Sequence, residues 1–328
     1  MMIQKETIQI IASLLMKNAG KVNMTGLDNG KAGLSLSLFM AAEYLHDEKM
    51  EDIAHQLLME SLIIPNADAG FENGLSGIGY AMLLLMDKKY LEADFDDVFG
   101  KQYEIIIRIL EKIENVSNSF LYYFQTVYFL SKIERVKKGD KRVKDIIRKL
   151  IEGIEWLLTV QFHDFENINF SRKKLDILCL YNAWLKLVSY SGYSNFSHSL
   201  IDIYGSLYQK GCIINSLEMG YYLKKIAFKY NIDRHDCIIN ENIRNGVKNI
   251  RLDRLSLRER IDIAKILSDL NYRDFHEHQL LPEINALHTD KGLLDLIVAT
   301  PETFSPLGYG AGIGRLLIYF VDKQTELL

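Results

Sequence analysis

The chain has 328 residues, of which 48% are hydrophobic and 25% charged, and its formal net charge at pH 7 is -4. This composition is typical of a globular protein with a sizeable core, and it argues against a nucleic-acid binder, which usually presents a basic face. No apolar run is long enough to cross a bilayer, so we expect no membrane span. The three cysteines form no CxxC pair, which indicates reduced thiols and a cytoplasmic protein.

The N-terminal residues 1–20 have helical spacing and predict an amphipathic helix rather than a signal peptide. Two glycine-rich stretches follow, GLDNGKAG from Gly26 to Gly33 and GFENGLSG from Gly70 to Gly77. Each places glycine, three residues, glycine, two residues and glycine just before an apolar run. We interpret both as turns before the second helix of a hairpin, where glycine permits positive φ and close approach of backbones.

Helical periodicity continues along the rest of the chain, and no alternating strand pattern interrupts it. Broadly apolar segments begin at Ser119, Lys173, Ile214 and Asp253, with amphipathic segments between them. Near the C-terminus, SPLGYGAGIGRLLIYF resembles the second glycine stretch and shares Gly-Ile-Gly with it, at Gly77–Gly79 and Gly312–Gly314. A repeat on the order of 45 residues is typical of paired helices and predicts about seven hairpins.

The helix after each glycine turn is apolar nearly all round, whereas the helix before it is amphipathic. Buried helices have the first pattern and surface helices the second. The sequence therefore predicts an all-α protein, an α/α toroid with an inner and an outer ring of helices, as one domain over residues 1–328. A superhelical solenoid is the main alternative. The match between the first and last repeats favours closure, because the end repeats of an open array tend to be atypical.

The glycine motifs resemble those of the lanthionine synthetase C-like family. The resemblance rests on G-L-x-x-G-x-A-G at Gly26–Gly33, on G-x-x-x-G-x-x-G-I-G at Gly70–Gly79, and on GYGAGIG near the end. It implies an α/α toroid of seven hairpins. Enzymes of that family add a cysteine thiol to a dehydrated Ser or Thr of a precursor peptide, and a zinc ion lowers the pKa of the thiol. Such a site has three protein ligands and one open position.

The zinc-ligand motifs that the resemblance implies, W-C-x-G and C-H-G, are both absent. Cys212 could occupy the first ligand position, but Gly211 and Ile214 replace the Trp and Gly of the motif. Leu257 and Arg258 stand where the Cys-His pair is expected, and neither a cation nor an aliphatic side chain ligates zinc. We therefore expect no zinc and no other cofactor. The leading hypothesis is a zinc-free relative that binds a precursor peptide or a partner enzyme of a peptide-modification pathway.

The alternative hypothesis is a metal-free enzyme, a hydrolase or lyase that acts on a glycan or a peptide with carboxylates at the mouth of the toroid. Glycan-processing enzymes use two acids across a cleft. All glycine turns would open on one end of a toroid, around one cavity. The candidate binding residues at this mouth are Asp28, Asn29, Glu72, Asn73 and Tyr309. Asp and Asn also favour turns and helix N-caps for structural reasons alone.

Other candidate sites have simpler explanations. The stretch His276–His278 (HEH) holds two imidazoles, but on a helix they point to different faces, so a solvated surface is favoured over a metal site. Cys179 is expected to be a small buried hydrophobe, and Cys237 has a histidine as a neighbour only in sequence. Acidic residues interrupt the basic stretch from Arg244 to Lys265, which predicts a solvated helix face.

Overall fold

The computed structural model describes residues 2–63, 68–113, 118–168, 172–232, 235–251, 254–272, 280–281, 303 and 305–322. Every regular element in these ranges is a helix, which confirms the all-α class. No helix within them combines the length and the hydropathy that a bilayer crossing requires. The contacts divide the chain into two compact units, residues 1–106 with 251–328 (unit 1) and residues 107–250 (unit 2). The single domain stays a prediction.

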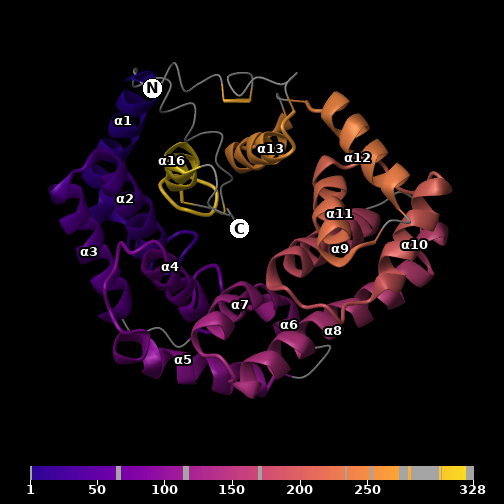
Figure 1. The fold of residues 1–328 in the computed structure, drawn as a ribbon, viewed down its shortest axis with the longest axis horizontal. Coiled ribbons are helices and arrows are strands. Elements are labelled where there is room, and N and C mark those ends of the chain that lie inside the picture. The colour runs from indigo at the N-terminus through magenta and orange to yellow at the C-terminus, as the bar shows by residue number, and fades with distance from the viewer. Residues whose placement is uncertain are drawn as a thin grey trace. The chain divides into compact units, whose positions relative to one another are not determined.

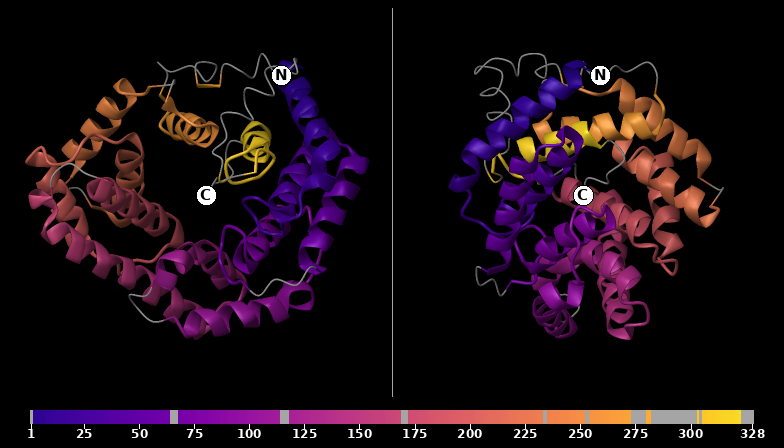
Figure 2. Two further views of the ribbon diagram at one scale, coloured as in Figure 1. Left: turned by 180° about the vertical axis from the view of Figure 1, so that it is seen from behind. Right: turned by 60° about the vertical axis from the view of Figure 1, so that its left-hand side comes forward.

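Unit 1 is built around α2, a helix that packs against four others. Its helices are α1 (Met2–Asn18), η1 (Ala19–Lys21), α2 (Lys31–Leu45), α3 (Glu48–Ile63), α4 (Leu75–Asp87), most of α5 (Phe95–Glu111), α13 (Leu257–Asp269) and α16 (Ile313–Val321). α2 packs on α1, α3, α4 and α16, and α16 also packs on α1 and α13. Figures 1 and 2 agree in placing α1, α2 and α3 side by side.

The helices that follow the glycine turns are buried on nearly every side, as the sequence predicts. All residues of Ala32–Ala42 in α2, Leu75–Leu85 in α4 and Ile313–Phe320 in α16 are buried. In α3, by contrast, the buried residues form one stripe that includes Met50 and Ala54. An amphipathic helix and an apolar one thus pack together, because only the second is covered all round.

Unit 2 is a series of helices, of which α8 and α9 are the longest. They are the end of α5, α6 (Asn118–Tyr123), η2 (Phe124–Thr126), α7 (Val127–Val136), α8 (Lys141–His163), η3 (Phe165–Asn167), α9 (Arg172–Ser191), α10 (His198–Gln209), α11 (Leu217–Tyr230) and α12 (Asp236–Lys248). α8 packs on α7, α9 and α10, and α11 packs on α9 and α12.

A buried asparagine connects three helices of unit 2. Asn242 of α12 is fully buried, and its Oδ1 accepts hydrogen bonds from the backbone N–H of Ser216 (3.0 Å) and the hydroxyl of Tyr204 (3.2 Å). Its Nδ2 donates to the carbonyl of Ile238 (3.0 Å). Because buried polar groups need partners, this side chain fixes α10 and the start of α11 relative to α12.

A buried carboxyl has the same role between α8 and α9. Glu155 Oε1 accepts hydrogen bonds from Trp184 Nε1 (3.2 Å) and from the backbone N–H of Ser197 (2.8 Å), just before α10. Burial raises the pKa of Glu155, and these two hydrogen bonds lower it by less. The neighbouring Tyr181 and Tyr204 stack with ring centroids 4.9 Å apart.

Three expectations need correction or lie outside the described residues. The apolar segment from Ser119 is not one continuous helix, because η2 interrupts it between α6 and α7. The basic stretch Arg244–Lys265 is not one helix face, because α12 ends at Lys248 and α13 begins at Leu257. The HEH stretch, residues 276–278, lies outside the described residues.

Candidate functional site

The three glycine-rich turns of unit 1 end in glycine N-caps with extended backbone. Gly30, Gly74 and Gly312 precede α2, α4 and α16, with φ of -124°, -107° and -101°. The expectation of positive φ at these helix starts is therefore wrong. The N-caps also correct the register of the repeat, since Gly312 corresponds to Gly74. Gly77–Gly79 lies inside α4, whereas Gly312–Gly314 spans the start of α16.

Close approach of backbones explains the glycines instead. A Cβ added to Gly33 would lie 1.8 Å from the carbonyl oxygen of Leu27, and one added to Gly26 would lie 2.2 Å from Cα of Asn73. Both distances are far shorter than any van der Waals contact. A side chain at either position would force the turns apart.

Equivalent hydrogen bonds join the turns into what we call the turn stack, residues 26–30, 70–74 and 308–312. The backbone N–H of Gly310 donates to the carbonyl of Asp28 (2.9 Å), and the N–H of Asp28 donates to the carbonyl of Glu72 (2.7 Å). Each bond joins the third residue of one turn to the third residue of the next. The third glycine-rich turn thus lies against the first, and the first lies against the second.

All five predicted mouth residues lie in the turn stack, but two of them serve its framework. The side-chain oxygen of Asn29 accepts a hydrogen bond from the backbone N–H of Ser305 (2.7 Å). Tyr309 is fully buried, and its Cβ is 2.6 Å from where a Cβ of Gly33 would be. Their positions are explained by packing and capping.

The remaining three differ in exposure. Asp28 is 6% exposed, and its carboxylate lies against Gly310. Glu72 is exposed, and Asn73 is half-buried with its backbone against Gly26. The two carboxylates of the turn stack therefore lie in different environments, one covered and one in solvent.

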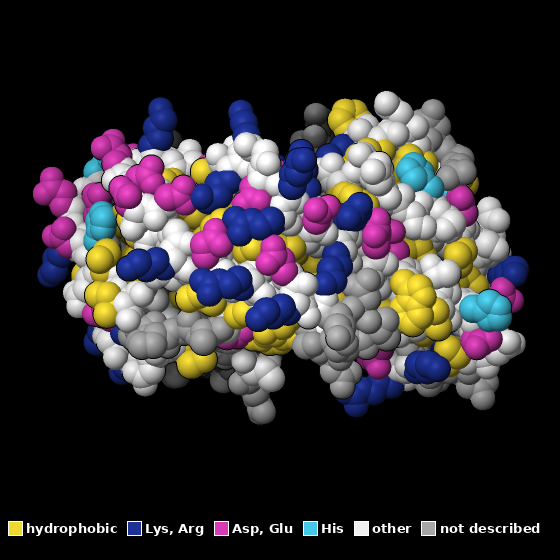
Figure 3. All heavy atoms as spheres, turned by 90° about the horizontal axis from the view of Figure 1, so that it is seen from below, with side chains coloured by type: hydrophobic (Ala, Val, Ile, Leu, Met, Phe, Trp, Pro, Cys, Tyr) yellow, Lys and Arg dark blue, Asp and Glu magenta, His cyan; other side chains and the backbone are white. Residues whose placement is uncertain are grey.

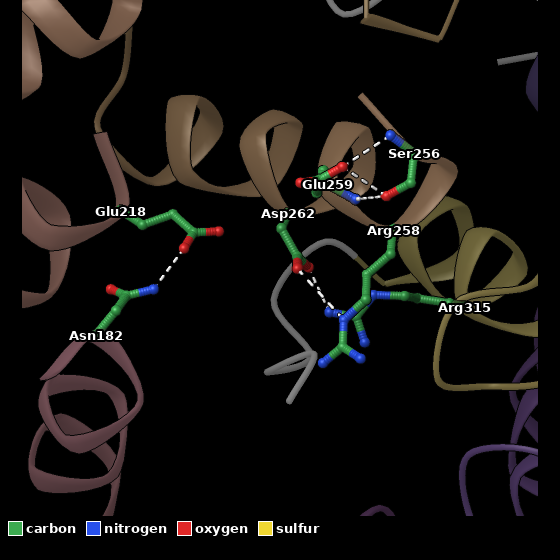
Figure 4. A network of polar contacts seen from close by, with 7 residues as sticks. All are labelled: Asn182, Glu218, Ser256, Arg258, Glu259, Asp262 and Arg315. Carbon is green, nitrogen blue, oxygen red and sulfur yellow. Dashed lines mark hydrogen bonds and ion pairs between the residues drawn. The ribbon is translucent and has the colours of Figure 1, made fainter. Parts of the chain in front are cut away.

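An ion pair beside the turn stack was not predicted from the sequence. Arg315 of α16 is fully buried, and its Nη2 donates to Oδ1 of Asp262 on α13 (Figure 4). Burial by itself lowers the pKa of Arg315, but the pair with Asp262 and the nearby charge of Asp28 raise it above its ordinary value. A signal was present in the sequence, since Arg315 is a charge within the apolar run GIGRLLIYF, and a buried charge requires a partner.

The positions where the resemblance expects two zinc ligands are at the start of α13. Leu257 is fully buried. Arg258 extends toward Asp262, with Nε 4.0 Å from Oδ2, and Figure 4 shows its guanidinium on the same carboxylate as that of Arg315. Ser256 caps this helix in a reciprocal capping box with Glu259. Two guanidinium groups and one carboxylate thus form a charged cluster here, which we call the Arg258 cluster: Arg258, Asp262 and Arg315.

None of the three cysteines belongs to a group of possible metal ligands among the described residues. Cys212 is half-buried and its Sγ lies 4.0 Å from the carbonyl of Lys210. Cys179 is exposed, which corrects the expectation that it is buried, although partial burial and two nearby carboxylates raise the pKa of its thiol. Cys237 is exposed too, and its neighbour His235 pairs with Asp202 (2.8 Å).

No group of three His, Cys, Asp or Glu side chains in the described part of the chain has the arrangement of a metal site. Together with the cation at Arg258, this donor set does not fit zinc.

Unit 2 has polar features of its own. Asn182 Nδ2 on α9 donates to Glu218 Oε2 on α11 (2.5 Å) (Figure 4). A groove of about 440 Å³ lies between α11 and α12, and Phe228, which is 88% exposed, forms part of its wall. None of the predicted mouth residues lines this groove.

Comparisons with known proteins do not extend the assignment. No protein-family model matches the chain, and no curated protein matches it.

Proposed function

We propose that this chain is a zinc-free relative of the lanthionine synthetase C-like proteins that binds a peptide, either a precursor or a segment of a modification enzyme. The observation that carries the proposal is the Arg258 cluster. At the place where the resemblance expects two metal ligands, the chain has a buried leucine and an arginine paired with a carboxylate. Such groups can recognise a peptide but cannot activate a thiol through zinc.

The toroid, with about seven hairpins, is part of this proposal. Its support comes from unit 1, where α16, the last helix that the structure describes, packs on α1 and α2. The last glycine turn also hydrogen-bonds to the first, at Gly310 and Asp28. In an open solenoid each repeat contacts only its sequence neighbours, so the first and last repeats would be far apart.

The chemistry of the Arg258 cluster suits a peptide. The side chains of Arg258 and Asp262 are 30% and 18% exposed, whereas Arg315 beneath them is fully buried. A guanidinium and a carboxylate side by side offer donors and acceptors to the carbonyls, amides and charged groups of a bound chain. Arg315 fixes the carboxylate from below, so the site is ordered before a ligand arrives, which lowers the entropy cost of binding.

Isothermal titration calorimetry with synthetic peptides from neighbouring genes tests the proposal. We expect binding that a zinc chelator leaves unchanged, and far less than one zinc per chain by elemental analysis. Arg258→Ala should weaken binding roughly tenfold, because it removes a charge-assisted hydrogen-bond donor. Arg254→Ala is the matched control, since Arg254 is exposed in the same unit. One zinc per chain, or indifference to every such peptide, would contradict the proposal.

A further inference from the structure

The hairpin of α7 and α8 in unit 2 has the densest positive charge in the sequence. Residues 132–149 contain nine Lys or Arg and three Asp or Glu, in a chain whose net charge is -4. The segment includes the end of α7, a turn with Gly139 at φ 99°, and the first turns of α8. Composition of the whole chain conceals this local excess, because acidic residues elsewhere balance it.

Each acidic residue of the segment already has a partner within it. Arg142 pairs with Asp140 (3.0 Å), Lys144 with Glu134 (3.7 Å) and Arg148 with Asp145 (3.1 Å). These pairs neutralise three of the nine basic side chains. The Nζ of Lys149 donates to the carbonyl of Glu111 in α5.

Three exposed cations remain around the turn. Arg135 is in the last turn of α7, Lys138 is in the connection, and Lys141 begins α8. All three are exposed, and none forms an ion pair within 4.0 Å with a described residue. Val136, between the first two, is 50% exposed. We call Arg135, Val136, Lys138 and Lys141 the α7–α8 basic surface.

We propose that the α7–α8 basic surface binds an acidic peptide segment of a partner protein. It is a few cations around one turn rather than a long stripe. On α8 the face that starts at Lys141 carries one acid, Asp145, after one turn and another, Glu152, after three turns, or roughly 17 Å. A nucleic-acid backbone has one negative charge about every 1.7 Å and favours continuous basic tracks.

The carboxylates within the segment also favour a peptide. Asp140 and Glu134, each paired with a cation of the segment, interrupt the positive surface that a continuous sheet of anionic lipid or a phosphate backbone would cover. A peptide can place separate carboxylates opposite Arg135, Lys138 and Lys141 and leave neutral residues opposite the acids. The exposed side chain of Val136 gives such a peptide an apolar contact at the centre of the surface. On the face of the molecule that Figure 3 shows, basic and acidic side chains are interspersed.

This inference rests on unit 2 alone and is independent of the peptide site proposed in unit 1. The test measures binding of the protein to a fluorescein-labelled synthetic peptide by fluorescence anisotropy. In this peptide glutamates alternate with alanine and leucine, and a second peptide with glutamine in place of each glutamate serves for comparison. The intact protein should bind the glutamate peptide, more weakly as salt rises, and should bind the glutamine peptide at least about tenfold more weakly.

Two charge-reversal variants locate the surface. Arg135→Glu, Lys138→Glu and Lys141→Glu together should weaken binding at least about tenfold. The matched control reverses Lys173, Lys224 and Lys248, three exposed lysines elsewhere in unit 2, and makes the same change in net charge. It should change the affinity less than about threefold. Circular dichroism establishes that each variant is folded.

Three results would overturn the inference. The control could lose as much affinity as the surface variant, which would indicate a general charge effect. The intact protein could fail to bind the glutamate peptide. It could also bind a short DNA duplex, or vesicles of phosphatidylcholine with about one third phosphatidylserine, more tightly than the peptide, which would assign the surface to another class of partner.

Discussion

Units 1 and 2 connect their helices in different ways. In unit 1 the starts of α2, α4 and α16 meet through backbone, and Gly310, Asp28 and Glu72 hydrogen-bond in sequence along the turn stack. In unit 2 the corresponding connections run through side chains. Asn242 joins α10, α11 and α12, and Glu155 joins α8 to α9 and to the loop before α10.

The difference explains why the glycine motif is recognisable only near the two ends of the sequence. A contact between backbones requires the absence of a side chain, so it leaves glycines at fixed spacing. A contact through an amide or a carboxyl leaves a common residue such as Asn242 or Glu155, which no local pattern distinguishes. The two modes also predict different responses to mutation.

The largest effect is expected in the turn stack. Gly33→Ala places a methyl group where only 1.8 Å separates it from the carbonyl oxygen of Leu27, so the backbone must shift. We expect a loss of about 3 kcal/mol in the free energy of unfolding, measured by urea denaturation. Gly20→Ala is the control, because nothing lies within 4 Å of its Cβ position. Equal effects of the two substitutions would contradict the role of close approach.

A smaller loss is expected at the side-chain connection of unit 2. Asn242→Ala removes the acceptor of the part-buried Ser216 N–H and of the buried Tyr204 hydroxyl. We expect a cost of about 2 kcal/mol in the same measurement. Asn240→Ala, at an exposed position of α12, should cost less than about 0.5 kcal/mol. If the two costs match, Asn242 does not connect the helices.

The smallest effect is a pH dependence at Glu155. Because burial raises its pKa above 4.5, the folded state retains the proton at pH values where the unfolded state has released it. Stability from this group is therefore fully present below the ordinary pKa and falls as the pH rises through the raised pKa. Glu155→Gln should flatten that fall and, at neutral pH, stabilise the protein by up to about 1 kcal/mol, since the amide oxygen still accepts both hydrogen bonds.

Glu155→Ala separates charge from hydrogen bonding. It leaves Trp184 Nε1 and the Ser197 N–H without their acceptor and should cost about 1–3 kcal/mol. Thermal unfolding between pH 4 and pH 8, roughly the range in which carboxyls and imidazoles titrate, measures both variants. A steeper pH dependence in the glutamine variant than in the wild type would refute the assigned direction.

The candidate site was predictable in part. Asp28, Asn29, Glu72, Asn73 and Tyr309 share one pattern of turns, and the structure brings these turns together. Their separate environments were not predictable, because the exposure of Glu72 and the burial of Asp28 depend on which turn lies on which side. The register of the last repeat was not predictable from the shared Gly-Ile-Gly sequence. These three residues lie inside α4 in the second repeat but span the start of α16 in the last one.

The sequence by itself determined the helices and the glycine turns, because helical periodicity and the space available to a side chain are local properties of the chain. The tertiary structure decided which turns meet and which charges pair. Asn29 bonds to Ser305 and Asp262 to Arg315, partners that no local pattern connects. A buried charge imposes the need for a counter-charge, but only packing determines which residue supplies it.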